Sequence, residues 1–122
     1  MRALVIDDSR AVRLFIRGIL AELGIEVVEA SNGREGLDRL ADSPADLILV
    51  DWNMPVMDGL EFITAVRARR EYDSVHIMMV TTETESEQVT RAMVAGANEY
   101  LMKPFTKEVL TAKLTLLEDF GA

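Results

Sequence analysis

Short apolar runs alternate with helical patterns along the whole chain. The runs that fit β-strands cover residues 3–6, 26–29, 47–50, 75–80 and 99–102. Between them, apolar side chains recur every three or four residues, as on one face of an amphipathic helix. Residues that can cap a helix precede these five segments, at Ser9, Asn32, Asp58, Thr84 and Thr106. Asn32 with Glu35 and Thr84 with Glu87 have the spacing of capping boxes, and Gly24 and Gly96 end the first and fourth helices.

This alternation predicts an α/β fold with a parallel sheet and helices on both faces. The unbroken apolar run 47–50 is typical of a strand buried on both sides. Five strand–helix units are too few to close an eight-stranded barrel, so we expect an open, doubly wound five-stranded sheet with five helices. The strand at 26–29 ends without a reactive side chain, which suits an edge position.

Composition narrows the class of protein. The chain has 122 residues, which fits one domain, and its formal net charge is −8 at pH 7. This acidic balance argues against broad nucleic-acid binding, which relies on basic patches. There is no cysteine, which excludes thiolate metal sites and thiol catalysis. No apolar run reaches the ~18 residues of a membrane span and no signal peptide is evident, so we expect a cytoplasmic protein.

Charged and hydroxyl side chains stand where the predicted strands end. Asp7 and Asp8 follow the first strand, Asp51 the third, Thr81 the fourth and Lys103 the fifth. The carboxyl ends of parallel strands meet at one rim, where open α/β sheets bind ligands. Two carboxylates ~5 Å apart repel by roughly 3 kcal/mol at an effective dielectric constant of 20. One lysine cannot neutralise three such groups, and an oxygen-only cluster favours a hard divalent cation such as Mg²⁺, with Mn²⁺ as a plausible substitute.

A carboxylate beside Mg²⁺ and a lysine is placed to attack phosphorus and form an aspartyl phosphate. The cation and the ammonium would stabilise charge on the phosphoryl oxygens, and Thr81 could donate a hydrogen bond to one of them. The chain has no Walker loop, no G-x-G-x-x-G turn and no G-x-S-x-G elbow, so nucleotide binding and serine hydrolysis have no support.

At these residues the chain resembles the receiver domain of two-component response regulators, from the first strand to the last helix. The motifs are Ile6-Asp7-Asp8-Ser9, Asp51-Trp52-Asn53-Met54-Pro55-Val56-Met57-Asp58-Gly59, Val80-Thr81-Thr82 and Lys103-Pro104-Phe105-Thr106. Each is weak alone, but four in this order and spacing are highly specific. The second motif is most similar to the stand-alone chemotaxis type, the CheY type. The resemblance implies a flavodoxin-like fold with strand order 2-1-3-4-5 and a single receiver domain over residues 1–122.

The resemblance also implies roles for individual residues. Asp51 would accept the phosphoryl group, and Lys103 would contact it through a loop in which the Lys103–Pro104 bond can be cis. Asp7, Asp8, Asp51 and the backbone carbonyl of Asn53 would bind Mg²⁺. Thr81 and Tyr100 would form the conformational switch, and Asn53 and Glu83 would tune dephosphorylation. Their identity predicts a short-lived phosphoryl group.

The implied partners are proteins. A sensor histidine kinase or a phosphotransfer protein would supply the phosphoryl group from a phosphohistidine. A downstream target would bind the fourth helix, fifth strand and fifth helix, and a phosphatase is a possible further partner. Turnover of a separate substrate, nucleic-acid binding and membrane binding are not expected. Chemotaxis or motility output, an intermediate relay and a receiver cut from a larger chain remain alternatives.

Simpler interpretations stay open for several residues. Asp7 and Asp8 could only cap the first helix, Tyr100 could only pack, and His76 is expected to start its strand without a phosphoryl-relay role. Arg10, Arg13 and Arg17 form a basic stripe that is either a solvated face or a docking surface for an acidic partner.

Two enzyme or cofactor classes compete with the receiver interpretation. A phosphatase of the haloacid-dehalogenase type would need Asp-x-Asp where this chain has Asp51-Trp52-Asn53. A flavin-binding module would need a Ser/Thr-rich phosphate loop after the first strand, which this sequence lacks.

Overall fold

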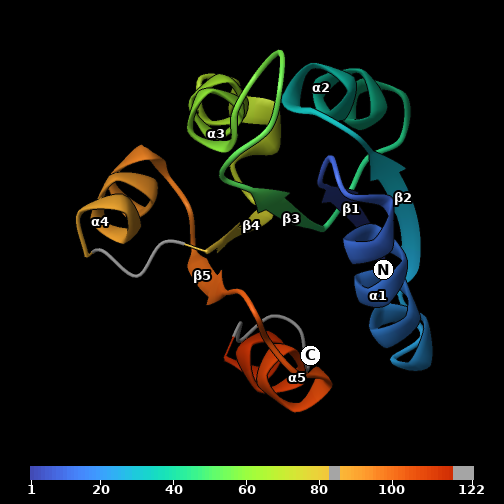
Figure 1. Cartoon of the computed structure of the whole chain (residues 1–122). Helices are drawn as coiled ribbons and strands as arrows, with labels where there is room; N and C mark the ends of the chain where they lie inside the picture. The colour runs from blue at the N-terminus through green and yellow to red at the C-terminus, as the bar shows by residue number, and fades with distance from the viewer. Residues whose placement is uncertain (83–85, 117–122) are drawn as a thin grey trace.

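The predicted α/β architecture is confirmed by the computed structural model, which describes residues 1–82 and 86–116 (Figure 1). The strands are β1 (Arg2–Ile6), β2 (Glu26–Ala30), β3 (Leu47–Asp51), β4 (His76–Thr81) and β5 (Glu99–Met102). The helices are α1 (Arg10–Glu22), α2 (Gly33–Asp42), α3 (Gly59–Arg67), α4 (Ser86–Ala95) and α5 (Lys107–Thr115). A short 3₁₀ helix, Arg70–Tyr72, is an element that the hydrophobic pattern did not predict.

All paired strands are parallel, and the sheet order is β2-β1-β3-β4-β5, the order of the flavodoxin-like fold. β2 lies at an edge, as its lack of a reactive end residue indicated. β4 is shifted by one residue from the predicted run, because it begins at His76 and includes Thr81. Thr81 is therefore part of the sheet rather than of the loop that follows.

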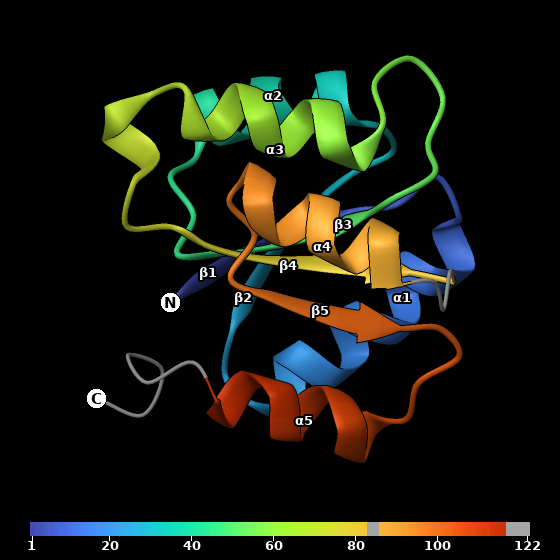
Figure 2. The same cartoon turned by 90° about the vertical axis from the view of Figure 1, so that its left-hand side faces the viewer.

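Two helical layers cover the sheet. On one face α2, α3 and α4 pack on a core that includes Phe62 and Ile63, both fully buried. On the other face α1 and α5 bury Ile16, Leu20 and Leu110 against the sheet. Figure 2 views the β5 edge and shows these layers above and below the strands, whose carboxyl ends point away from the N-terminus. In the described part of the chain, no helix is long and apolar enough to cross a bilayer.

Side-chain caps start the helices at the predicted residues. Ser9, Asn32, Asp58 and Thr106 each accept a hydrogen bond from the backbone N–H three residues further on. Asp58 and Glu61 form a complete capping box. At Asn32 only the first half of the predicted box is described, and the Glu35 carboxylate accepts instead from the Ser31 hydroxyl at 3.0 Å. The box predicted at Thr84 lies outside the described residues.

The start of α3 packs directly on the end of β3. Gly59 donates its N–H to the Trp52 carbonyl, and a Cβ at Gly59 would stand 2.4 Å from the carbonyl oxygen of Asp51. A glycine is required there because the obstacle is backbone. The tight packing fixes the backbone that carries Asp51.

We expect Gly59→Ala to lower the free energy of unfolding by about 1–3 kcal/mol, because the added methyl group must displace the Asp51 backbone. Gly18→Ala is the matched control, since Gly18 is exposed in the middle of α1 with nothing within 4 Å of the added carbon. That control should raise stability by about 0.5–1 kcal/mol. Urea unfolding measures both, and an unchanged midpoint for Gly59→Ala would contradict the packing argument.

Candidate functional site

The acidic residues predicted from the strand ends lie together at one rim of the sheet. Asp7 and Asp8 follow β1, and Asp51 is the last residue of β3, the strand next to β1. One carboxylate oxygen from each of the three lies within 4.8 Å of the others. Asp7 and Asp51 are only 2% and 7% exposed, whereas Asp8 faces solvent.

Hydrogen bonds at its backbone N–H and at both carboxylate oxygens help to hold Asp7 in this cluster. Its backbone N–H donates to the Ala30 carbonyl of β2 at 3.1 Å. Its Oδ1 accepts from the Ser9 N–H at 2.8 Å, and its Oδ2 accepts from Lys103 Nζ at 2.9 Å. Ser9 is also the N-cap of α1, so the loop that carries both acids is built into the start of that helix.

Lys103 supplies the positive charge of the cluster. It follows β5, and its ammonium lies 2.9 Å from Asp7 Oδ2 and 3.4 Å from Asp51 Oδ1. Burial by itself lowers the pKa of Lys103, but the hydrogen bond to Asp7 and the charges of Asp51 and Asp7 outweigh it, and the pKa rises. Lys103 therefore stays charged at neutral pH. The Lys103–Pro104 peptide bond is cis, as the resemblance implied.

One ammonium does not balance three carboxylates. Burial and the neighbouring charge of Asp7 raise the pKa of Asp51 to about 6, although Lys103 opposes the rise. Asp51 is thus a carboxylate whose ionised form is poorly stabilised by the protein alone. Oxygen ligands with excess negative charge are what a hard divalent cation such as Mg²⁺ requires, so the residues present fit such an ion.

Thr81 and Tyr100 share one face of the sheet. Thr81 pairs with Met102 and Tyr100 with Met79, so the two side chains are diagonal neighbours on β4 and β5. Thr81 is buried, and its hydroxyl donates a long hydrogen bond of 3.5 Å to Gln88 Oε1 on α4. The Tyr100 ring is half-buried under the ammonium of Lys113, 4.2 Å from the ring centroid.

The loop after β3 shows two features that sequence reasoning missed. The Trp52 ring, which is nearly buried, lies 5.8 Å from the guanidinium carbon of Arg91 on α4. Val56 has φ of 70°, a left-handed conformation that strains a β-branched residue, and no sequence signal predicts it. Asn53 is exposed two residues after Asp51, and Glu83 lies outside the described residues.

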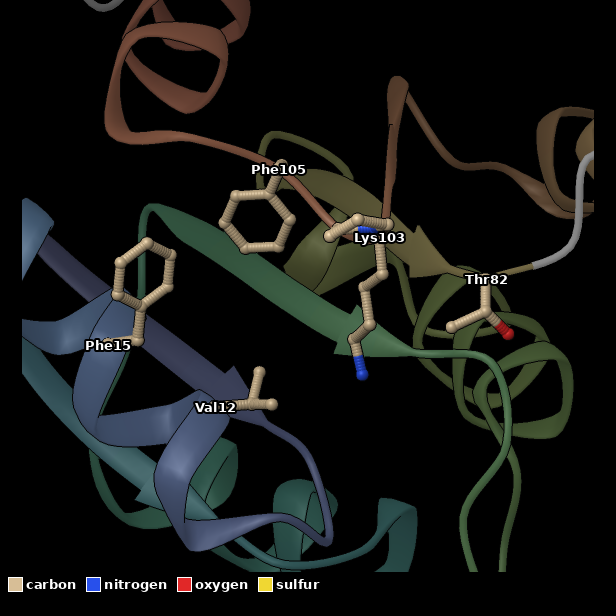
Figure 3. Close-up of a pocket in the computed structure, with 6 residues that line it drawn as sticks. Val12, Phe15, Thr82, Lys103 and Phe105 are labelled. Carbon is tan, nitrogen blue, oxygen red and sulfur yellow. The ribbon is translucent and has the colours of Figure 1, made fainter.

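A hollow of about 500 Å³ opens beside Lys103, between α1 and the loop that follows β5. Its lining includes Val12, Phe15, Thr82 and Phe105 (Figure 3). Phe15 and Phe105 face each other with ring centroids 5.7 Å apart, and Phe15 is 48% exposed. Thr82 is thus at the rim of the site but, unlike Thr81, is exposed.

Two residues of the basic stripe on α1 form ion pairs within the domain. Arg13 and Arg17 both form ion pairs with Glu29 of β2, at 3.0 and 2.5 Å, and Arg10 is exposed. His76 begins β4, at the opposite end from Thr81 and about 17 Å along the strand from it. That placement separates His76 from the acidic cluster.

We expect Asp51→Asn to raise the free energy of unfolding by about 1–3 kcal/mol at pH 7.5 in the presence of EDTA. The folded-state pKa of about 6 exceeds the ordinary value of 3.8, so the folded protein binds this proton more tightly than the unfolded chain. The Asp51 contribution to stability therefore falls as pH rises from about 4 to 6, and the gain from Asn should vanish near pH 4. Asp38→Asn, at an exposed position of α2, controls for net charge. Equal shifts for both variants in urea unfolding would contradict this assignment.

Comparison with known proteins identifies the family. The family model described as the response regulator receiver domain matches residues 3–115. A chemotaxis protein CheY homolog of Campylobacter jejuni is 44% identical over 116 residues, which cover 93% of this chain and 89% of that protein. Chemotaxis protein CheY1 of Helicobacter pylori strain J99 is 41% identical over 119 residues, or 96% of each chain.

Solved structures agree with the sequence relatives. The chemotaxis response regulator CheY4 of Vibrio cholerae superposes with a TM-score of 0.89 at 39% identity, covering 94% of this chain and 96% of that one. A CheY-like receiver domain protein of Methanospirillum hungatei gives a TM-score of 0.87 at 30% identity, with 97% and 93% covered. The chain therefore belongs to the response regulator receiver domain family, and its relatives include proteins of the CheY type.

Proposed function

We propose that residues 1–122 act as a single receiver domain that is switched by phosphorylation of Asp51. The observation that carries this proposal is the position of Asp51 itself. It is a buried carboxylate at the end of a central strand, with Lys103 3.4 Å away and two further acids within 4.8 Å. Membership of the receiver family supports the same assignment.

In the proposed reaction, an oxygen of Asp51 forms a bond to the phosphorus of a phosphohistidine on a sensor kinase or phosphotransfer protein. The phosphorus–nitrogen bond breaks and its electron pair goes to that ring nitrogen, so the imidazole, which carries a proton on its other ring nitrogen, leaves as the neutral base. Asp51 is already ionised when the pH exceeds its pKa of about 6, so it needs no general base. Lys103 neutralises charge on the phosphoryl oxygens, and the Thr81 hydroxyl donates to one of them.

Asp7, Asp8, Asp51 and the backbone carbonyl of Asn53 are the proposed ligands of Mg²⁺, for which Mn²⁺ is a plausible substitute. When bound, the cation supplies positive charge that offsets the carboxylates and the transferring phosphoryl group. The poorly compensated charge of Asp51 supports a cation at this position.

The proposed switch runs through Thr81 and Tyr100. A Thr81 hydroxyl that turns to a phosphoryl oxygen loses its contact with Gln88, which frees one attachment of α4. Tyr100 then has room to turn inward from its place under Lys113. The face formed by α4, β5 and α5 would change shape, and we propose that a downstream protein binds there.

Chemotaxis or motility signalling is the output that we propose, because the named relatives are chemotaxis proteins. Both the switch and the partners are consistent with a cytoplasmic location. A phosphatase partner is part of the proposal, whereas nucleic-acid binding, membrane binding and turnover of a separate substrate are not. An intermediate phosphorelay role is the alternative output.

Incubation with acetyl phosphate and Mg²⁺ should convert the protein to a species heavier by about 80 Da, the mass of one phosphoryl group. The gain should disappear in EDTA and in Asp51→Asn, and should persist in Asp38→Asn. Intact mass spectrometry measures this directly. A mass gain that persists in Asp51→Asn would place the phosphoryl group on another residue and contradict the proposal.

We also expect the phosphoryl group to be short-lived, lost within minutes rather than hours when Mg²⁺ is present. Asn53 is small, polar and exposed beside Asp51, so it leaves water access to the phosphorus. Glu83, the second proposed tuning residue, matches the chemotaxis type in sequence. The measurement is intact mass as a function of time after removal of acetyl phosphate, and a half-life of many hours would refute the expectation.

A further inference from the structure

Arg13 joins the acidic loop to the edge of the sheet. Its Nη1 donates to the backbone carbonyl of Asp7 at 2.5 Å, and its Nε donates to Glu29 Oε1 at 3.0 Å. The side chain is 16% exposed, low for an arginine on the outer surface of a helix. The contact with Asp7 links α1 to the loop that carries both β1 acids.

Glu29 keeps this arginine in place. It is the fourth residue of β2 and pairs in register with Val5 of β1, so it lies beside the strand that ends at the site. Burial by itself raises the pKa of Glu29, but the hydrogen bonds and charges of Arg17 and Arg13 outweigh it and lower the pKa. Glu29 is therefore ionised at neutral pH and can orient the guanidinium of Arg13.

The contact between Arg13 and Asp7 matters because it also helps to place the neighbouring Asp8. Asp7 is held at its carbonyl by Arg13, at Oδ1 by Ser9 and at Oδ2 by Lys103. Within the described part of the chain, the exposed Asp8 carboxylate makes no hydrogen bond or ion pair of its own. Its position next to the cluster is set by the backbone on both sides, where Arg13 holds the Asp7 carbonyl and Ser9 begins α1.

We propose that Arg13 is a positioning residue for the cation site, and that it acts through the Asp7 carbonyl on the placement of Asp7 and Asp8. This inference rests on the proposed function, because it takes the three acids as cation ligands. It assigns to Arg13 a role that differs from both a solvated face and a docking surface.

Charge alone makes the opposite prediction. Removing a cationic side chain near three carboxylates should strengthen the binding of Mg²⁺. Positioning predicts weaker binding, because the carbonyl of a buried residue loses its partner and the loop relaxes. Arg17 separates the two effects, since it carries the same charge and pairs with the same Glu29 but is half-exposed and, among the described residues, makes no hydrogen bond to the acidic loop.

The test is a Mg²⁺ titration of Arg13→Met and Arg17→Met, both of which keep an unbranched apolar stem. Fluorescence of Trp52, the only tryptophan and the neighbour of Asp51, reports binding, and the backbone amide shifts of Asp8 and Ser9 give a second readout. We expect about tenfold weaker Mg²⁺ binding for Arg13→Met, the effect of losing one charged hydrogen bond. For Arg17→Met we expect a change below about twofold. Arg13→Lys keeps the charge but cannot reach both the Asp7 carbonyl and Glu29, so it should bind Mg²⁺ more weakly than the wild type. This variant keeps the test available if the methionine variant does not fold.

A kinetic split distinguishes positioning from general destabilisation. With acetyl phosphate as donor, the phosphorylation rate of Arg13→Met should approach that of the wild type at saturating Mg²⁺ and fall behind at low Mg²⁺. Equal Mg²⁺ affinities in the two methionine variants, or a rate deficit that saturating Mg²⁺ does not repair, would overturn the inference alone. A wild-type protein that does not respond to Mg²⁺ would overturn the proposed function and, with it, this inference.

Discussion

The mutual repulsion of Asp7, Asp8 and Asp51 is the constraint on which the rest of this structure depends. Their oxygens lie within 4.8 Å of one another and share one nearby ammonium, that of Lys103. At such distances each pair of charges costs about 3 kcal/mol at an effective dielectric constant of 20, a large part of the stability of a small domain. The surrounding fold keeps the three acids together, and its contacts with them offset their repulsion.

The resistance comes from backbone packing as well as from charge. The start of α3 packs so closely on the Asp51 carbonyl that even a Cβ at Gly59 would clash with it, which fixes the backbone of Asp51. Asp7 follows β1, which lies between β2 and β3, and it is held by a backbone hydrogen bond to Ala30 of β2 and a side-chain hydrogen bond from the Ser9 N–H. The ammonium that contacts Asp7 and Asp51 comes from the far edge, because Lys103 follows β5 and its long side chain reaches across the rim. The parallel topology is what allows residues so distant in sequence to meet there.

Much of this could be predicted from the sequence because strand ends and caps are local signals. The apolar runs stop at Asp7, Asp51 and Lys103, and a parallel sheet brings such positions to one rim. Cap residues such as Ser9 and Asp58 reveal helix starts for the same local reason. The raised pKa of Asp51 was not predictable, because it depends on burial by residues remote in sequence. The strained backbone at Val56 also leaves no trace in the residue type.

Arg13 shows why long side chains are the hardest part of a site to predict. At helical spacing with Arg10 and Arg17 it belongs to a basic stripe, and the stripe alone does not distinguish solvent, a partner or an internal acceptor. The acceptors are decided by the strand pairing, which brings Glu29 of β2 beside β1, and by the loop after β1, in which the Asp7 carbonyl accepts from Arg13 of α1. A cluster of mutually repelling carboxylates needs hydrogen-bond donors such as Ser9 and Arg13 on the loop that carries it, as well as a bound cation. In this protein, therefore, the residues that hold the three carboxylates close together against their repulsion are spread over β2, α1, α3 and the loop after β5.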